Sequence, residues 1–275
     1  MPTKTKVRNM FDSIAGDYDA LNHILSLDVD KIWRKKALKQ IVDAPAPAQV
    51  LDLACGTGDF SIAIAKALSR SHKRVGTPIE AHVKAPAKAP VEAQVTSTGF
   101  VTGDSGRSDL MTKGHVTGVD LSEGMLAVMR EKVQKSGLTE MISIEEGDGE
   151  NLRFPDNTFD RVTIAFGIRN FENREKGLRE MLRVLKPGGR LVILELSRPE
   201  NKIIRWFYDL YFLHILPKIG GKVSGDKAAY AYLPASVAAF PGKKAFMATM
   251  REAGFRTITH KAFTLGICRM YTGEK

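Results

Sequence analysis

Residues 50–60 read VLDLACGTGDF, and this segment constrains the fold more than any other part of the chain. The apolar run Val50–Ala54 predicts a strand, the small residues after it predict a tight loop, and a helix-like segment begins at Asp59. Gly56 and Gly58 can adopt backbone conformations that other residues rarely adopt, and they leave room for a ligand beside the backbone. A plain strand-to-helix turn in some other α/β domain is the alternative interpretation.

The loop suits a ligand with hydroxyl groups and a cation better than it suits a pyrophosphate. A dinucleotide-binding fingerprint would carry a third glycine at position 61, where Ser61 stands. Asp52 and Asp59 would repel a phosphate. S-adenosylmethionine has a ribose, an amino group and a sulfonium but no phosphate, so the loop favours this cofactor, and Asp52, Gly56 and Gly58 become candidate cofactor-binding residues.

Strand-like and helix-like segments alternate along the rest of the chain, which predicts an α/β fold with a parallel, doubly wound, Rossmann-like sheet. Residues 1–47 read as an N-terminal helical cap, and the whole chain of 275 residues reads as one domain. The predicted strands after the glycine loop are 115–119, 141–145, 158–165 and 190–195, followed by a C-terminal antiparallel pair at 255–262 and 266–271. The predicted helices are 59–68, one capped by Ser122, 173–185 and 245–253.

Composition marks two unusual segments and excludes some classes of protein. Residues 71–115 are rich in Ala, Pro, Lys, Val, Thr, Ser and Gly, which predicts a flexible low-complexity insertion. Residues 201–275 carry twelve Lys/Arg against four Asp/Glu, a net charge of +8. Cys55 and Cys268 form neither a disulfide framework nor a metal-ligand set, so we expect no metal site. No apolar signal core or run of 18 apolar residues occurs, so we expect a cytoplasmic protein.

Acidic side chains follow the ends of the first three predicted strands. In an open α/β sheet, ligands bind at the carboxyl ends of the strands. Asp120 ends the second strand, where a carboxylate can accept both ribose hydroxyls, and the 71–115 insertion explains its distance in sequence from the glycine loop. The alternative role for Asp120, capping the next helix, is better suited to Ser122.

The motifs VLDLACGTGDF, GVDLSEGML, EEGDGENLRFPDNTFD and FGIRNFENREKGLREMLRVLKPGGRLVILELSRP together resemble the class I S-adenosylmethionine-dependent C-methyltransferases of menaquinone and ubiquinone biosynthesis. MFDSIAGDYDALNHILSLDVDKIWRKKA near the start and AYAYLPASVAAFP near the end are similar to the same family. The resemblance implies methylation of a prenylated quinol at a ring carbon. It also implies cofactor contacts from Thr57, Asp120, Asp148 and Gly149, while Ala165 stands where the family often has a serine.

The segment FGIRN supplies candidate catalytic residues. Deprotonation of a phenol, whose pKa is near 10, makes a quinol ring carbon strongly nucleophilic, and a fixed cation would stabilise the phenolate. Arg169 is the candidate cation, Asn170 is a candidate to orient a water or a quinol oxygen, and Asp148 is a candidate to take the proton through that water. A surface ion pair with Glu172 is the alternative role for Arg169.

The substrate implied by this resemblance is demethylmenaquinol, with the polyprenyl benzoquinol of ubiquinone biosynthesis as the alternative. Apolar residues within 203–217 form part of a predicted lid or membrane-facing segment at 201–245, beside the basic C-terminal region. We expect peripheral association with the inner face of the membrane, although such a stripe can also face a core. A basic nucleic-acid-binding module with a vestigial cofactor fold is a rival function, but no aromatic stacking platform or RNA module accompanies the charge, so no nucleic-acid partner is expected. A small-molecule O-methyltransferase is a third possibility.

Overall fold

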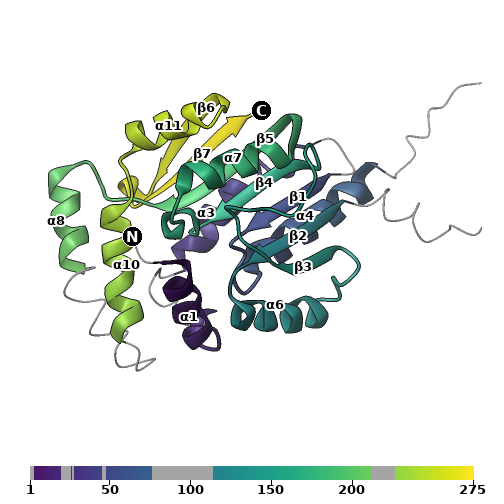
Figure 1. Cartoon of the computed structure of the whole chain (residues 1–275), viewed down its shortest axis with the longest axis horizontal. Coiled ribbons are helices and arrows are strands. Elements are labelled where there is room, and N and C mark those ends of the chain that lie inside the picture. Colours follow the sequence, from purple (N-terminus) through teal and green to yellow (C-terminus); the bar gives the residue numbers. More distant parts are fainter. Residues whose placement is uncertain (1–2, 20–25, 27, 45–47, 76–113, 212–226) are drawn as a thin grey trace, which may run out of the picture.

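The computed structural model describes residues 3–19, 26, 28–44, 48–75, 114–211 and 227–275 (Figure 1). Its centre is a seven-stranded sheet in the order β3-β2-β1-β4-β5-β7-β6. β7 runs antiparallel to both β5 and β6, and the other pairs are parallel. The strands are β1 (Gln49–Leu53), β2 (His115–Asp120), β3 (Ile142–Glu146), β4 (Phe159–Ala165), β5 (Leu185–Leu196), β6 (Arg256–Phe263) and β7 (Cys268–Glu274). The predicted α/β class and the antiparallel C-terminal pair are confirmed.

Helices cover both faces of the sheet. The α-helices are α1 (Lys4–Ile14), α3 (Val29–Leu38), α4 (Asp59–Val75), α6 (Glu123–Lys135), α7 (Arg174–Val184), α8 (Lys202–Leu210), α10 (Lys227–Ala239) and α11 (Lys243–Glu252); η1 (Ile168–Asn170) and η3 (Thr264–Gly266) are 3₁₀ turns. α3, α4 and α6 pack against one face, and α7 and α11 pack against the other. The fold therefore has three layers (Figure 1).

The central strands are apolar on both sides because both faces are covered. In β5, Val192 and Leu194 belong to the cluster under α3, α4 and α6, whereas Leu191 and Ile193 belong to the cluster under α7 and α11. This alternation is the period of two expected of a strand. Because β1 to β4 run parallel, their carboxyl ends lie at one edge of the sheet, where the glycine loop lies.

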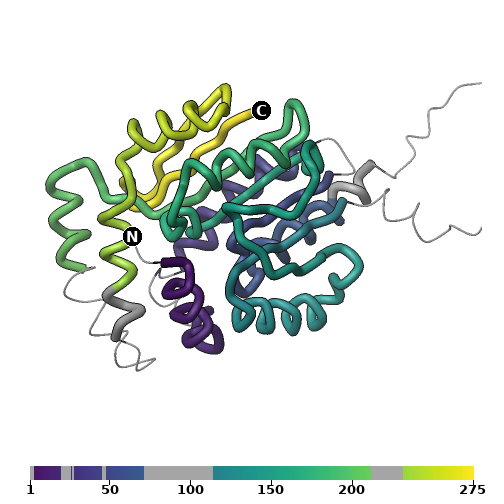
Figure 2. The backbone as a smooth tube through the Cα atoms, viewed as in Figure 1, coloured from purple at the N-terminus to yellow at the C-terminus, as the bar shows by residue number. Residues whose placement is uncertain are grey.

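Side-chain caps fix the starts of two helices. Ser122 Oγ accepts a hydrogen bond from the Met125 N–H at 3.2 Å, which confirms the predicted N-cap of α6. Asn173 Oδ1 likewise accepts from the Lys176 N–H at 2.9 Å and begins α7. α1 lies beside α6 and between it and α10, so the N-terminal segment reaches the edge of the sheet (Figures 1 and 2).

Some element bounds differ from the predicted ones. α4 continues to Val75 rather than ending near residue 68. The first five residues of the predicted insertion 71–115 are therefore helical. Residues 76–113 of the predicted insertion lie outside the described residues, and so does part of the predicted 201–245 segment. β5 begins at Leu185 rather than Arg190 and contains a turn at Gly188, whose φ is +74°, with a bulge in its pairing to β4. None of the described helices is long and apolar enough to cross a bilayer.

Candidate functional site

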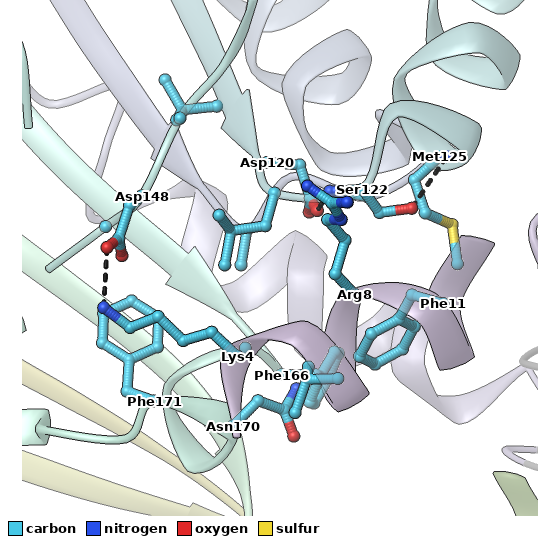
Figure 3. Close-up of a pocket in the computed structure, with 18 of the residues that line it drawn as sticks. Lys4, Arg8, Phe11, Asp120, Ser122, Met125, Asp148, Phe166, Asn170 and Phe171 are labelled. Carbon is cyan, nitrogen blue, oxygen red and sulfur yellow. Dashed lines mark hydrogen bonds and ion pairs between the residues drawn. The ribbon is translucent and has the colours of Figure 1, made fainter. Parts of the chain in front are cut away.

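A pocket lies at the edge of the sheet where the loops after β1, β2, β3 and β4 meet, with α1 over it (Figure 3). It encloses about 780 Å³, part of which is open to solvent. Among the residues that line it are Lys4, Arg8, Phe11, Tyr18, Gly56, Asp120, Asp148, Gly149, Phe166, Asn170 and Phe171. The structure therefore brings together four predicted loop positions, Gly56, Asp120, Asp148 and Asn170, that come from four different segments.

The backbone beside the pocket adopts left-handed conformations at several positions. Gly56 has φ +57° and Gly58 has φ +82°, and a Cβ at position 58 would lie 2.4 Å from Met129 Cγ. Ala54 (φ 49°) and Phe166 (φ 62°) are in the same region although neither is glycine. Such conformations cost about 1–3 kcal/mol each and persist where the surrounding structure fixes them, commonly at functional sites. Both residues line the pocket, so the strain is concentrated where β1 and β4 end.

Asp120 is held in a fixed orientation at the end of β2. Its Oδ2 accepts from the Gly56 N–H at 2.8 Å, and its Oδ1 accepts from the Ser122 N–H at 2.9 Å. Burial raises the pKa of Asp120, and these backbone hydrogen bonds oppose the change. Asp120 lines the pocket, and each of its oxygens can accept a further hydrogen bond, which is what a ligand with two neighbouring hydroxyl groups requires.

Asp148 forms an ion pair that the sequence analysis did not anticipate. Lys4 Nζ lies 2.6 Å from Asp148 Oδ2 and 3.1 Å from Glu150 Oε2 (Figure 3). Burial alone would lower the pKa of Lys4, but hydrogen bonds and charges from these two carboxylates raise it overall. The Lys4 backbone N–H also donates to Glu172. The positive N-terminal end of α1 thus contacts three carboxylates, two of which, Asp148 and Glu150, line the pocket.

Polar contacts also hold the other end of α1 and the residues after it. Ser122 Oγ donates to Asp12 Oδ1 at 2.6 Å, and the Gly124 N–H donates to the same oxygen at 3.0 Å. Asp19 accepts from Thr57 and pairs with Lys132. Val7 is the buried residue of α1. Ionic and polar contacts therefore contribute much of what keeps this helix over the pocket.

Replacing Lys4 by methionine should loosen α1. The substitution keeps the length of the side chain but leaves Asp148 and Glu150 without their shared cation. A charge-assisted hydrogen bond contributes about 1.5–3 kcal/mol, and the partial exposure of this pair reduces that to about 1 kcal/mol. Amide hydrogen exchange across α1 should accelerate about fivefold. Lys6→Met, on an exposed part of the same helix, is the matched control; equal exchange in both variants would show that the ion pair does not hold α1.

Arg169 does not line the pocket, contrary to the expected position of a catalytic cation. Its Nη1 lies 2.8 Å from Glu195 Oε1, and the two side chains are 7% and 0% exposed. Its Nε donates to Ser236 Oγ at 3.3 Å. The predicted alternative partner, Glu172, instead receives the Lys4 N–H. Arg169 is thus part of a buried ion pair behind the pocket wall, because β5 lies beside β4 and carries Glu195 next to its last residue.

Asn170, the neighbour of Arg169, does line the pocket. Tyr232 Oη in α10 donates to Asn170 Oδ1 at 2.8 Å, which leaves the Asn170 amide group to donate. Tyr18 lines the same pocket; burial raises its pKa, while the positive charges of Arg169 and Arg34 act in the opposite direction. The charge of Arg169 therefore reaches a pocket phenol without direct contact with the cavity.

The remaining predicted residues support the loops. Asp52 is buried beneath the glycine loop and accepts a hydrogen bond from Ser61 Oγ at 2.6 Å. Three predicted cofactor-binding residues do not line the pocket: Asp52, Thr57 and Gly58. Gly149 packs closely against Phe171, since a Cβ at position 149 would lie 2.6 Å from Phe171 Cζ. In the described part of the chain, no cluster of His, Cys, Asp and Glu side chains could hold a metal ion.

The sequence analysis missed Lys4, Arg8, Phe11 and Tyr18. It predicted an N-terminal helical cap, but helical periodicity alone did not show which face of that cap meets the cofactor loop. Lys4, Arg8 and Phe11 recur at spacings of four and three, which places them on one face of α1. That spacing is the signal from which this lining could have been predicted.

Known proteins resemble this chain over its full length. The sequence pattern of the ubiE/COQ5 methyltransferase family matches residues 2–275. A Geobacter sulfurreducens protein named ubiquinone/menaquinone biosynthesis C-methyltransferase UbiE is 43% identical over 98% of this chain and 88% of its own length. The demethylmenaquinone methyltransferase of Deinococcus radiodurans is 41% identical over 98% of this chain and 92% of its own length.

Solved structures share the fold. A SAM-dependent methyltransferase from Thermotoga maritima, described as a possible histamine N-methyltransferase, aligns with a TM-score of 0.57 and 16% identity over 98% of this chain and 99% of its own. A SAM-dependent methyltransferase from Aquifex aeolicus aligns with a TM-score of 0.52 and 19% identity over 87% of this chain and 88% of its own. At these identities the comparison establishes the class I methyltransferase fold.

Proposed function

Because the chain belongs to the ubiE/COQ5 methyltransferase family, we propose that it methylates demethylmenaquinol at a ring carbon, giving menaquinol and S-adenosylhomocysteine. The family establishes an S-adenosylmethionine-dependent C-methyltransferase of menaquinone or ubiquinone biosynthesis. Relatives named demethylmenaquinone methyltransferase support the choice of substrate. The observation that carries the proposal is one pocket with a carboxylate rim at Asp120 and Asp148 and with Asn170 and aromatic side chains beside it.

We assign the carboxylate rim to the cofactor. The Asp120 carboxylate would accept hydrogen bonds from the ribose hydroxyls, Gly56 would let the backbone approach the methionine portion, and Asp148 and Gly149 would contact the nucleoside. Gly58 gives the loop its left-handed turn. Asp52 and Thr57 act through the loop that they brace. Asp148 Oδ2 is already paired with Lys4, so we assign this carboxylate to binding rather than to proton transfer.

Asp120→Ala should weaken binding of S-adenosylhomocysteine. Loss of a hydrogen-bonding carboxylate costs roughly 1.5–3 kcal/mol, which is about a tenfold to 150-fold increase in the dissociation constant. Calorimetry on the folded variant measures this directly. Asp156→Ala, at an exposed carboxylate paired with Arg183, should bind as the unchanged protein does. Unchanged affinity in Asp120→Ala would remove Asp120 from the site.

The acceptor is activated by loss of a phenolic proton. The ring carbon would then attack the sulfonium methyl group; a C–C bond forms and the S–CH₃ bond breaks with its electron pair left on sulfur. The ring carbon then gives up its proton to water while the phenol oxygen takes one up, which restores the aromatic quinol. Asn170 orients the acceptor oxygen or a water that carries the proton to solvent. The Arg169 charge, held by Glu195 and fixed before reaction, stabilises negative charge on the acceptor side.

A prenylated quinol is dissolved in the bilayer, so we propose that the protein works at the membrane surface as a peripheral protein. The net charge of +8 over residues 201–275 supports attraction to anionic lipid. The benzoquinol precursor of ubiquinone is the nearest alternative substrate, since some relatives carry both pathways in their names.

Mass spectrometry of the quinone pool tests the proposal. Cells that lack this protein should accumulate demethylmenaquinone. Expression of the protein in those cells should restore a quinone pool that carries one more ring methyl group. Accumulation of a desmethyl benzoquinone instead would favour the alternative substrate, and an unchanged pool would overturn the proposal.

A further inference from the structure

α8 presents an apolar face to solvent. Among the described residues, six large apolar side chains are strongly exposed, and four of them belong to this one helix. They are Ile203 (70% exposed), Trp206 (62%), Phe207 (60%) and Leu210 (41%). Scattered exposed apolar residues are normal on soluble proteins, but a contiguous apolar patch marks an interaction surface.

α8 is packed against the rest of the protein through its inner face, so its orientation is fixed and its outer face is the one that meets solvent. Ile203, Phe207 and Leu210 are spaced by four and three residues, with Trp206 packed against Phe207 at a ring separation of 4.9 Å. On the other side, Tyr208 is buried against Val237 of α10, with Tyr211 alongside. α8 is therefore apolar on both its inner and its outer faces, which is typical of a helix that meets a second apolar phase.

The charges around this face favour an anionic surface. The two nearby carboxylates already have cationic partners: Asp209 pairs with Arg198 at 2.5 Å, and Glu200 pairs with Lys243 at 2.9 Å. Arg205 donates to the backbone carbonyls of Pro199 and Glu200 and is not neutralised by them. Lys202 is exposed at the start of the helix. Positive charge therefore exceeds negative charge along an apolar face, as in helices that lie on anionic bilayers.

The same helix is connected to the acceptor side of the pocket. Val237, which packs against Tyr208, is in α10, and that helix also places Ser236 on Arg169 and Tyr232 on Asn170. α8 and α10 lie side by side at one end of the molecule (Figures 1 and 2). A lipid-dissolved acceptor that reaches α8 is thus one helix away from Asn170.

We propose that the outer face of α8, formed by Ile203, Trp206, Phe207 and Leu210, inserts into the headgroup region of an anionic bilayer and docks the protein for access to its substrate. The inference rests on the proposed function for its purpose, since a prenylated quinol is held in that bilayer. Its binding energy comes from burial of the four side chains, with Lys202 and Arg205 adding attraction to anionic headgroups.

The fluorescence of Trp206 reports on this insertion. The second tryptophan, Trp33, is buried and donates to Thr264 Oγ1 at 2.9 Å, so it supplies a constant background. Phosphatidylcholine vesicles containing phosphatidylglycerol should shift the emission to the blue and sediment with the protein. Added salt should weaken binding, and neutral phosphatidylcholine vesicles should bind less protein. Trp206→Phe should abolish the emission shift but retain sedimentation.

A double substitution identifies the surface. Trp206→Ser with Phe207→Ser should lower vesicle partitioning at least about tenfold, because two large apolar side chains are lost. Ile32→Ser removes another exposed apolar side chain, on α3, and should leave partitioning unchanged. Equal partitioning of the double variant and the unchanged protein would overturn the proposal. A concentration-dependent blue shift without vesicles, accompanied by a doubled mass, would also overturn it and identify a second copy as the occupant.

This experiment contains no quinol and measures no methyl transfer. Vesicle binding through α8 with no methylation of demethylmenaquinol would leave the docking surface intact and overturn the assigned substrate. Methylation of demethylmenaquinol without vesicle binding through α8 would leave the assigned substrate intact and overturn the docking surface.

Discussion

Arg169→Ala should lower the free energy of unfolding by about 3–5 kcal/mol, because it would leave Glu195 as an unpaired charge in the interior. Glu195 is fully buried, and its carboxylate accepts from Arg169 Nη1 at 2.8 Å, from the Arg169 N–H at 3.1 Å and from the Leu196 N–H at 2.8 Å. The two backbone donors alone would not compensate for the burial of this charge. Urea-induced unfolding measures the loss.

A paired substitution separates the charge from the packing. Arg169→Met with Glu195→Gln removes both charges and keeps similar volume, so it should recover much of the stability that Arg169→Ala loses. Equal stability of the single and double variants would contradict the ion-pair account. In the folded fraction of Arg169→Ala, single-turnover methyl transfer should also fall, because Arg169 precedes Asn170 in η1 and its charge acts on the pocket phenol of Tyr18. Arg169→Lys keeps the charge but loses the planar fork, so it should also be slower.

The stability of the protein should fall as pH rises through the titration of Asp52. Burial raises the pKa of Asp52 to about 7, although the Ser61 hydrogen bond and the Arg34 charge oppose the change. In the unfolded chain this pKa is about 3.9. Between about pH 4 and pH 7 the folded state holds a proton that the unfolded state has released, so rising pH favours unfolding by up to about 4 kcal/mol.

Asp52→Asn removes this titration and keeps an oxygen that can accept from Ser61. The difference in unfolding free energy between the variant and the unchanged protein should therefore increase with pH across this window and level off above it. Urea unfolding at several pH values, with each variant compared at the same pH, isolates Asp52 from other titrating groups. Parallel stability profiles would show that the buried carboxyl does not titrate in this range.

Local chemistry explains why much of the fold could be predicted. The apolar run before the glycine loop predicted β1, and Ser122 predicted the start of α6 because it supplies an acceptor for an otherwise unsatisfied N–H group. The helix expected over 173–185 is α7, and Asn173 caps it in the same way. Asp120 was predicted because a strand end, rather than a distant contact, determines its position. Such features depend on a few neighbouring residues, so the 71–115 interruption did not obscure them.

Contacts between distant segments were not predictable in the same way. Lys4 contacts Asp148 across 144 positions, and the helical pattern of the N-terminal cap does not say which loop the helix covers. The ion-pair partner of Arg169 is Glu195, which the sequence analysis did not predict. Spacing along the chain suggested Glu172, but β4 and β5 are parallel neighbours in which Ala165 pairs with Leu194. That register brings Glu195 beside the residues that follow β4, so sheet order is the better guide to this partner.

The central claim is that the pocket unites S-adenosylmethionine with a quinol ring carbon. The most direct test incubates the purified protein with demethylmenaquinol and S-adenosylmethionine that carries a deuterated methyl group, and then locates the label by mass spectrometry. The account predicts one labelled methyl group bonded to a carbon of the quinol ring, with one S-adenosylhomocysteine formed per transfer. A label on a quinol oxygen, or no transfer by protein that binds the cofactor, would contradict it.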